Sequence, residues 1–153
     1  DLKPENVLLG PDGRAKIGDF GVASVMDSRR QYKSTRLLGS LGYMSPEQLQ
    51  GREIGPASDI YSLGLIAFRL ITGRELHTCG STLLQLRQRL HSESPAPSQF
   101  NPRCPAELDA IVLKALKVDP VHRYASAEYM FLDFLSLLEA QRSRRGDVFK
   151  TVQ

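Results

Sequence analysis

The chain has 153 residues, of which 41% are hydrophobic and 24% charged, and its net charge is +3. This length allows one ordinary domain with a buried core, and the composition excludes a disordered or fibrous protein. No apolar run approaches the ~20 residues that a membrane-spanning helix needs.

Two short apolar segments near the start of the chain predict a β-hairpin. Residues 7–10 and residues 15–18 read as strands, and Pro11-Asp12-Gly13 between them is a turn signal. The hairpin folds the chain back on itself, so that residues at its open end lie close together.

Residues 22–42 show no sustained hydrophobic period and predict a long surface loop. Within it, residues 28–36 hold four basic side chains and no acidic one. A phosphate on Ser34 or Thr35 would find positive partners there, which can order a loop. A solvated polar loop accounts for the same composition equally well.

Helical spacing begins at residue 57. Apolar side chains recur from Ile60 to Ile71, and Gly73 ends the run. Because these side chains fall on several faces, the helix is expected to be buried nearly all round. A second helix is expected at about residues 81–90, and the four prolines in residues 92–105 indicate a loop.

Two further helices are predicted in the last third of the chain. One begins at Pro105 and buries apolar side chains between Leu108 and Leu116. Ser126 can cap the other. Its predicted buried face consists of Met130, Phe131, Phe134, Leu135 and Leu138. The predicted fold class is therefore mainly α with a small β-hairpin.

The surplus of positive charge lies in the tail, residues 140–153. There Asp147 is the only acidic residue, against Arg142, Arg144, Arg145 and Lys150. We interpret this segment as a basic tail or linker rather than an arm for nucleic acid or membrane, and expect no nucleic-acid partner.

Cysteine and histidine usage gives no sign of a disulfide or a metal site. Cys79 and Cys104 lie far apart without CxxC spacing, so we interpret both as free thiols in a reducing compartment and expect a cytoplasmic location. The three histidines show no metal-ligand spacing.

Four polar residues near the start of the chain fit the needs of phosphoryl transfer. That reaction needs a carboxylate for the hydroxyl proton, metal ligands for the phosphates and a cation at the transferring group. Asp1 can be the carboxylate and Lys3 the cation. Asn6 and Asp19 offer the oxygen ligands that Mg²⁺ prefers, and the hairpin lets them face one metal site.

These residues stand in two motifs, Asp1-Leu2-Lys3-Pro4-Glu5-Asn6 and Gly18-Asp19-Phe20-Gly21. In this order, joined by a hairpin, the motifs resemble the catalytic loop and metal-binding segment of a Hanks-type Ser/Thr protein kinase. The similarity implies a kinase-like C-terminal lobe over residues 1–139, half of the two-lobe α+β kinase domain, in a fragment that starts at the catalytic-loop aspartate. The implied parts are residues 1–21 (catalytic loop, hairpin and metal motif), 22–47 (activation segment) and 57–139 (helical body).

The resemblance also implies roles for individual residues in binding and transfer. Asp1 would be the catalytic aspartate and Lys3 the γ-phosphate lysine. Asn6 and Asp19 would hold Mg²⁺ or Mn²⁺ with ATP. Leu8 would lie under the adenine ring, with Ile66 and Leu70 below it, although ordinary core packing explains Leu8 equally well.

Residues 39–47 are similar to the segment that closes the kinase activation loop. There Ser40 would bond Asp1 and Lys3 beneath the substrate hydroxyl. Glu47 would form a buried ion pair with Arg123, although 76 residues separate them and two exposed charges would be the ordinary interpretation of either alone.

Three further positions carry the resemblance. Phe20 would be the packing residue of the metal motif. Asp59 would be a buried helix aspartate that accepts backbone hydrogen bonds from the catalytic loop. Tyr61 replaces the tryptophan of many eukaryotic kinases, which favours a bacterial relationship.

The implied function is transfer of the ATP γ-phosphate to Ser or Thr hydroxyls of a protein substrate. Glu5 could meet a basic substrate residue or be an ordinary surface charge. No glycine-rich loop or strand lysine occurs in these residues. We therefore expect the N-terminal lobe as a missing partner. In these residues alone we expect weak ATP binding or none, and no activity. Any membrane anchor would lie elsewhere in the parent protein.

Two other functional classes remain open. In one, the parent is a pseudokinase or a scaffold that acts by binding proteins, which the upstream strand lysine and helix glutamate would decide. In the other, the chain is an unrelated helical binding module, which would require several ordered motif matches to be accidents.

Overall fold

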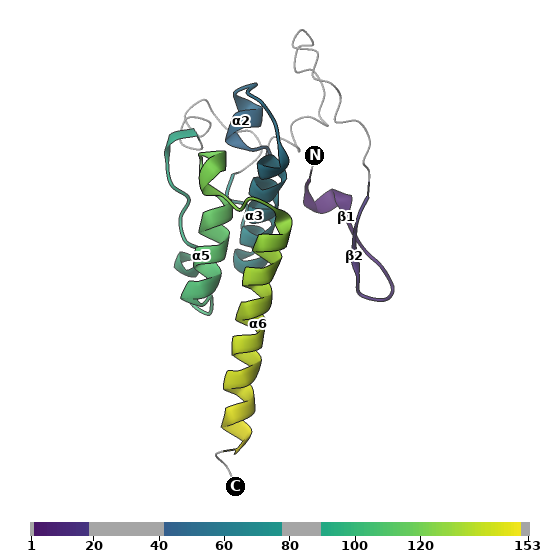
Figure 1. Cartoon of the computed structure of the whole chain (residues 1–153), viewed down its shortest axis with the longest axis vertical. Helices are drawn as coiled ribbons and strands as arrows, with labels where there is room; N and C mark the ends of the chain where they lie inside the picture. Colours follow the sequence, from purple (N-terminus) through teal and green to yellow (C-terminus); the bar gives the residue numbers. More distant parts are fainter. Residues whose placement is uncertain (1, 19–41, 78–89, 151–153) are drawn as a thin grey trace.

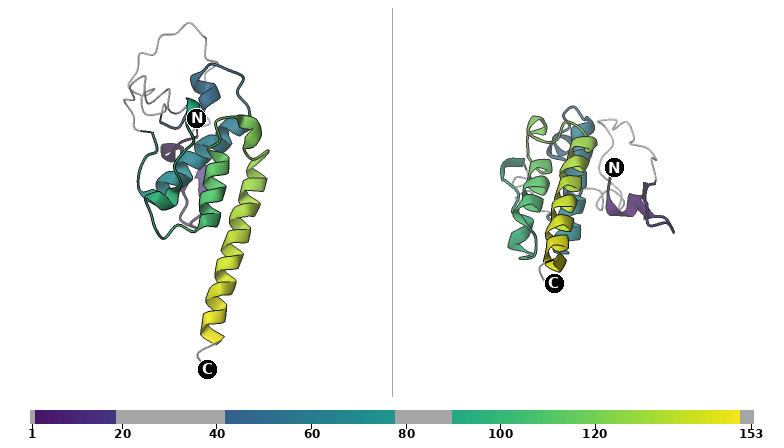
Figure 2. Two further views of the ribbon diagram at one scale, coloured as in Figure 1. Left: turned by 90° about the vertical axis from the view of Figure 1, so that its left-hand side faces the viewer. Right: turned by 60° about the horizontal axis from the view of Figure 1, so that its bottom comes forward.

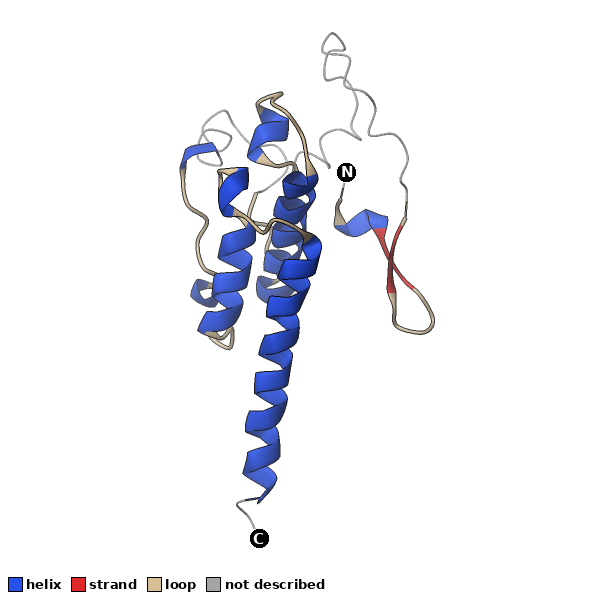
Figure 3. Ribbon diagram, in the orientation of Figure 1, coloured by secondary structure: helices blue, strands red, loops and turns tan. Residues whose placement is uncertain are grey.

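The computed structural model describes residues 2–18, 42–77 and 90–150, with side chains in the last stretch as far as residue 144. These residues are mostly helical with one two-stranded sheet, which confirms the predicted fold class (Figure 3). The predicted loop at residues 22–42 and the predicted helix at 81–90 lie outside the described residues, except for Gly42 and Leu90.

The elements follow one another in an order that puts the sheet first. In the chain they are η1 (Pro4–Asn6), β1 (Val7–Leu9), β2 (Ala15–Ile17), α2 (Pro46–Leu49), α3 (Pro56–Thr72), η2 (Pro97–Gln99), α5 (Ala106–Ala115), η3 (Pro120–His122) and α6 (Ala127–Lys150).

The predicted hairpin is present. β1 and β2 pair antiparallel with Val7 opposite Ile17 and Leu9 opposite Ala15. Gly13 makes the turn possible with a positive φ of 75°, a conformation that side chains disfavour. In Figure 1 the hairpin stands beside the helices rather than among them.

α3 is the central helix of the described body, and its predicted limits are confirmed. It begins at Pro56, where a proline costs no hydrogen bond, and ends at Gly73, whose left-handed φ of 69° lets its N–H donate to the carbonyl of Arg69. Eight of its 17 residues are buried, so the helix is buried on much of its surface but not all round. Leu70, for example, is 80% exposed.

The three long helices are joined through α5, which packs against α3 on one side and α6 on the other (Figures 1 and 2). Two clusters of apolar side chains form the core. The first contains Tyr43, Tyr61, Leu65, Ile66, Phe68, Val112 and Leu116. The second contains Ile60, Ile111, Ala115, Tyr124 and Met130. Gly64 permits the close approach of α3 and α5, because a Cβ there would lie 3.0 Å from the Cβ of Ala115.

The buried face predicted for α6 is wrong in part. Met130 is 1% exposed, and Phe134 and Leu137 pack against the same cluster. By contrast, Phe131, Leu135 and Leu138 are 60%, 37% and 52% exposed. Both sets follow helical spacing but lie about 100° apart around the helix, and α5 covers only the first.

The expected linker after residue 139 is helical. α6 begins directly after Ser126, at the predicted place, and continues without a break to Lys150. Its last turns extend away from the other helices (Figure 1).

The apolar residues that the resemblance places near the adenine ring differ in their exposure. Leu8 is 57% exposed, as expected for a surface that another part of the domain would cover. Ile66 is not part of that surface, because it is 8% exposed and packs inside the first core cluster. Phe20 lies outside the described residues.

Cys104 is buried and free, and burial raises the pKa of its thiol to about 11. A thiol that stays protonated at neutral pH is a poor nucleophile, which agrees with a structural role. Cys79 lies outside the described residues.

Shortening a side chain to alanine should cost more stability on the buried face of α6 than on its exposed face. Met130→Ala is expected to lower the free energy of unfolding by about 2–4 kcal/mol, because it leaves a cavity in the second core cluster. Phe131→Ala, on the exposed face of the same turn, is expected to cost less than about 1 kcal/mol. Urea denaturation of both variants measures this, and equal losses would contradict the described packing.

Candidate active site

A single 3₁₀ turn, η1, arranges the described part of the predicted catalytic loop. Lys3 precedes it with an extended backbone, and Pro4 begins it, where the missing N–H costs nothing. The N–H of Asn6 donates to the carbonyl of Lys3 at 3.0 Å and closes the turn. Lys3 and Asn6 therefore lie within one tight turn, and Asn6 is buried.

The hairpin ladder continues into this turn. The N–H of Gly18 donates to the carbonyl of Asn6 at 2.8 Å, next to the last strand pair, Val7 with Ile17. Position 18 is thus fixed beside position 6. The structure does not describe six of the predicted site residues, namely Asp1, Asp19, Phe20, Ser34, Thr35 and Ser40.

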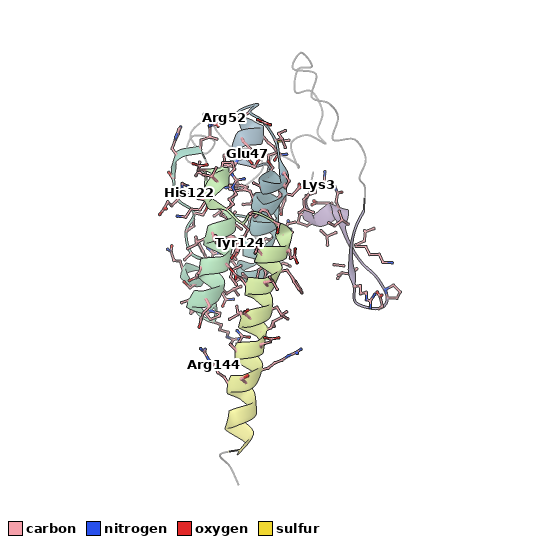
Figure 4. The ribbon with its side chains drawn as sticks, in the orientation of Figure 1. Lys3, Glu47, Arg52, His122, Tyr124 and Arg144 are labelled. Carbon is pink, nitrogen blue, oxygen red and sulfur yellow. The ribbon has the colours of Figure 1, made fainter. Side chains whose placement is uncertain are left out.

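Apolar contacts fix the turn against the helices. Leu2 and Val7, on either side of η1, pack against the core cluster that contains Tyr43 and Ile66. Figure 4 shows Lys3 on this turn, next to the helical body and apart from Glu47. The turn is therefore held from both ends.

The segment that leads into α2 is held by side-chain hydroxyls. Ser62 on α3 donates to the carbonyl of Tyr43 at 2.8 Å. Ser45 caps α2 in a capping box, in which its hydroxyl accepts from the N–H of Gln48 and the Gln48 side chain accepts from the N–H of Ser45. Ser45 is fully buried, so these bonds also satisfy groups that water cannot reach.

Glu47 and Arg123 form the buried ion pair that the sequence predicts. Nη1 and Nη2 of Arg123 donate to Oε1 and Oε2 of Glu47, each at 2.8 Å. Both residues are 5% exposed. Ser58 adds a hydrogen bond from its hydroxyl to Oε1 at 2.7 Å.

Arg123 also binds three backbone carbonyls. Nε donates to Lys117 at 2.7 Å, Nη1 to Ala57 at 2.7 Å and Nη2 to Val118 at 2.9 Å. With the two bonds to Glu47, all five N–H donors of the guanidinium are used. The guanidinium also lies 4.8 Å from the ring centroid of Tyr61, a cation–π distance.

The charge state of Glu47 follows from these bonds. Burial alone would raise the pKa of its carboxyl, but the hydrogen bonds from Arg123 and Ser58 outweigh burial and lower the pKa to about 2. Glu47 is therefore ionised wherever the protein is folded near neutral pH, as a structural rather than a proton-transferring group.

Asp59 departs from the prediction of a buried aspartate. It lies in the first turn of α3 and is exposed. A carboxylate in this position is favourable to the helix dipole without any tertiary bond. The expected backbone donors belong to the catalytic loop around residue 1, which lies outside the described residues.

Residues 1–135 match the family model described as "Protein kinase domain". The chain belongs to the protein kinase family. The match contains every described element from η1 to the first part of α6.

Three similar bacterial proteins are named as serine/threonine-protein kinases. The kinase chain is 38% identical to serine/threonine-protein kinase PrkC of Bacillus subtilis over 93% of its own length, and 41% identical to probable serine/threonine-protein kinase SCO3848 of Streptomyces coelicolor over 92%. It is 34% identical to serine/threonine-protein kinase PknL of Mycobacterium tuberculosis over 91%. The chain spans only 22%, 21% and 35% of the lengths of these relatives.

Two interactions of this kinase chain were not predicted from the sequence. The bond from Ser58 to Glu47 was missed because a serine at a helix start ordinarily indicates local capping. The contact of Arg123 with Tyr61 was missed because no spacing rule joins residues that far apart. Tyr61 was noted only for replacing a tryptophan.

Searches for other kinds of site found none in the described stretches. Of the helices in residues 2–18, 42–77 and 90–150, none has the length and apolar character of a membrane span. The same residues hold no group of three His, Cys, Asp or Glu side chains that could bind a metal ion. Asp19 lies outside these residues.

Stability in acid should depend on Glu47. Because its pKa falls from 4.5 when unfolded to about 2 when folded, its contribution is complete above about pH 4.5 and is lost as the pH falls toward 2. We expect this group alone to account for about 3 kcal/mol over that range. Glu47→Gln should flatten this part of the stability curve and cost about 3 kcal/mol at pH 7.

Glu93→Gln is the matched control, because Glu93 forms an exposed ion pair with Lys117. It should change stability by less than about 1 kcal/mol at either pH. Denaturant titrations from pH 2 to pH 7 measure both variants. If Glu47→Gln lost stability between pH 4.5 and pH 2 as steeply as the unmodified protein, the Glu47–Arg123 ion pair would not be the cause of that loss.

Proposed function

We propose that the chain is the catalytic part of a Ser/Thr protein kinase that transfers the γ-phosphate of ATP to Ser or Thr hydroxyls of a protein substrate. The observation that carries the proposal is the bond from Gly18 to Asn6. Gly18 is thereby fixed beside Asn6, and Asp19 is the next residue in the sequence, so we propose that its carboxylate serves the same site as Asn6. Lys3 belongs to the same turn.

The donor set fits a divalent cation. Asn6 supplies an amide oxygen and Asp19 a carboxylate, and hard ions such as Mg²⁺ and Mn²⁺ bind oxygen ligands of this kind. When bound, the ion would offset negative charge on the phosphate oxygens of ATP. Burial of Asn6 in the turn limits its freedom and so holds its side chain in place.

The remaining residues have roles in proton transfer and positioning. As the substrate oxygen bonds to the γ-phosphorus and the bond to ADP breaks, Asp1 accepts the hydroxyl proton. Lys3 places a positive charge at the transferring group. Ser40 is proposed to hold Asp1 and Lys3 in position by hydrogen bonds.

The exposed apolar side chains of the hairpin favour the presence of a partner lobe. Leu8, Leu9 and Ile17 are 57%, 78% and 54% exposed. A two-stranded hairpin that exposes this much apolar surface is only marginally stable on its own. We propose that the N-terminal lobe covers it and that the adenine ring binds between that lobe and Leu8.

A scaffold or pseudokinase remains the second candidate. The polar residues that chemistry needs, Asp1, Lys3, Asn6 and Asp19, are all present in the sequence, which favours the active enzyme. Ser34 and Thr35 stay candidates for a regulatory phosphate, for the reason given by their basic surroundings.

These 153 residues alone are expected to bind Mg-ATP weakly or not at all, because they contain neither the glycine-rich loop nor the strand lysine that a kinase uses to hold the phosphates. Isothermal calorimetry of the isolated chain should show no binding at micromolar ATP. Micromolar affinity would refute the proposed need for the other lobe.

Catalysis in the longer protein that carries this sequence is expected to depend on Asp1. Asp1→Asn should lower phosphate transfer at least about 100-fold, because an amide cannot take the proton. Asp12→Asn is the matched control: Asp12 lies in the exposed hairpin turn, where its side chain accepts from the N–H of Arg14, as an amide also can.

Radiolabelled phosphate transfer to a generic protein substrate measures both variants. Normal transfer by the Asp1 variant would exclude it as the base. No transfer by the unmodified protein would favour the scaffold.

A further inference from the structure

A cluster of charged and hydroxyl groups lies beside η1, and the proposed chemistry does not use it. Arg69 on α3 donates from Nη1 to the hydroxyl of Tyr43 at 2.7 Å and to Oε1 of Glu75 at 2.9 Å. Gly73 ends α3 in the left-handed conformation, turns the chain back and so allows Glu75 to reach Arg69.

The charge of Glu5, in η1, also affects Arg69 and Tyr43. The hydrogen bond to Tyr43 raises the pKa of Arg69, and the charges of Glu75 and Glu5 raise it further. Burial raises the pKa of the Tyr43 hydroxyl, and although Arg69 opposes this, the same two carboxylates add to it. Arg69 thus lies in the field of two carboxylates from two different segments.

This cluster borders the place where a protein substrate is expected. Glu5 follows Lys3 by two residues in the same turn. Tyr43 follows Ser40, the residue proposed to lie beneath the substrate hydroxyl, by three. The side chains of Arg69 and Glu75 are 42% and 34% exposed, so a bound peptide can reach both.

We propose that Arg69 is a built-in cation that fills an acidic substrate subsite formed by Glu5 and Glu75, and that it thereby sets the charge preference of the kinase for its substrate. The inference rests on the proposed function and names the substrate class of that same site. Without Arg69, two carboxylates and a tyrosine hydroxyl would suit a Lys or Arg side chain of the substrate.

With Arg69 in place, the enzyme itself supplies the cation. A basic substrate residue then gains nothing at this position, because Glu75 is already paired and the guanidinium repels a second positive charge at close range. Acidic and neutral residues are accepted. Among the described residues, Nε and Nη2 of Arg69 have no acceptor, so these donors are available to a substrate carboxylate or phosphate.

The alternative is that Arg69 only holds Tyr43 in place by its hydrogen bond. A purely structural role would affect the transfer to all substrates alike, whereas a subsite residue changes the order of preference among them. The test therefore compares substrates rather than overall activity.

The experiment uses the longer protein that carries this sequence and measures kcat/KM for a set of peptides. The peptides differ only in carrying Arg, Gln, Glu or phosphoserine at one position near the acceptor serine, and every flanking position is tried in turn. The unmodified kinase should use Arg peptides no better than Gln peptides at any position. Separate Glu and phosphoserine arms distinguish a carboxylate from a phosphate as the acidic group.

Arg69→Gln should prefer Arg over Gln at one position by about 3- to 10-fold, because it frees the Glu75 carboxylate and removes a positive charge that acts on Glu5. Arg69→Lys keeps the charge and should keep the original order. Arg74→Gln is the matched control, since it removes the same charge from a side chain that lies 5.3 Å from the ring of Phe100, away from the cluster. Its order of preference should not change.

Glu75→Gln gives an independent test if Arg69→Gln does not fold. It removes the partner of Arg69, so Glu and phosphoserine peptides should gain by about 3-fold or more. The inference is overturned if the unmodified kinase already prefers Arg peptides, or if neither substitution changes the order.

Failure of the proposed function would look different. No transfer by the unmodified protein to any peptide would overturn that function, and the present inference with it. Transfer with an order of preference that no variant changes would overturn the inference alone.

Discussion

The ion pair between Glu47 and Arg123 joins parts of the chain that are far apart in sequence, and the described architecture depends on it. One guanidinium binds the carboxylate on α2, the first turn of α3 through Ala57, and the carbonyls that follow α5. Because all its donors are used, the cost of burying the charge is offset by hydrogen bonds in every direction. The pair stabilises α2 relative to the core, while Ser62 holds the carbonyl of Tyr43 to α3.

The sequence predicted those features that depend on local spacing. The hairpin followed from two apolar segments and a turn signal, and α3 followed from its apolar period and the terminal Gly73. The Glu47–Arg123 pair was predicted by resemblance to a family, since nothing local relates two charges so distant in sequence. The convergence of Asn6 and Asp19 on one metal site stays a prediction.

The burial and contacts of residues that depend on tertiary packing could not be predicted in the same way. α6 carries two apolar stripes of equal spacing, and only the position of α5 decides that Met130 is buried and Phe131 is not. The resemblance implied that Asp59 is buried, yet the first turn of α3 leaves it exposed. Arg69 gave no periodic signal, and its role follows only from the fold that brings Tyr43, Glu75 and Glu5 around it.

The anchoring of both ends of the segment between Gly18 and Gly42 has a thermodynamic consequence. Gly18 is fixed by its bond to Asn6, and Tyr43, next to Gly42, is fixed by Ser62. The loop-closure entropy of the intervening residues is therefore lost when the lobe folds. A phosphate added to Ser34 or Thr35, the proposed sites, would not have to offset that entropy a second time.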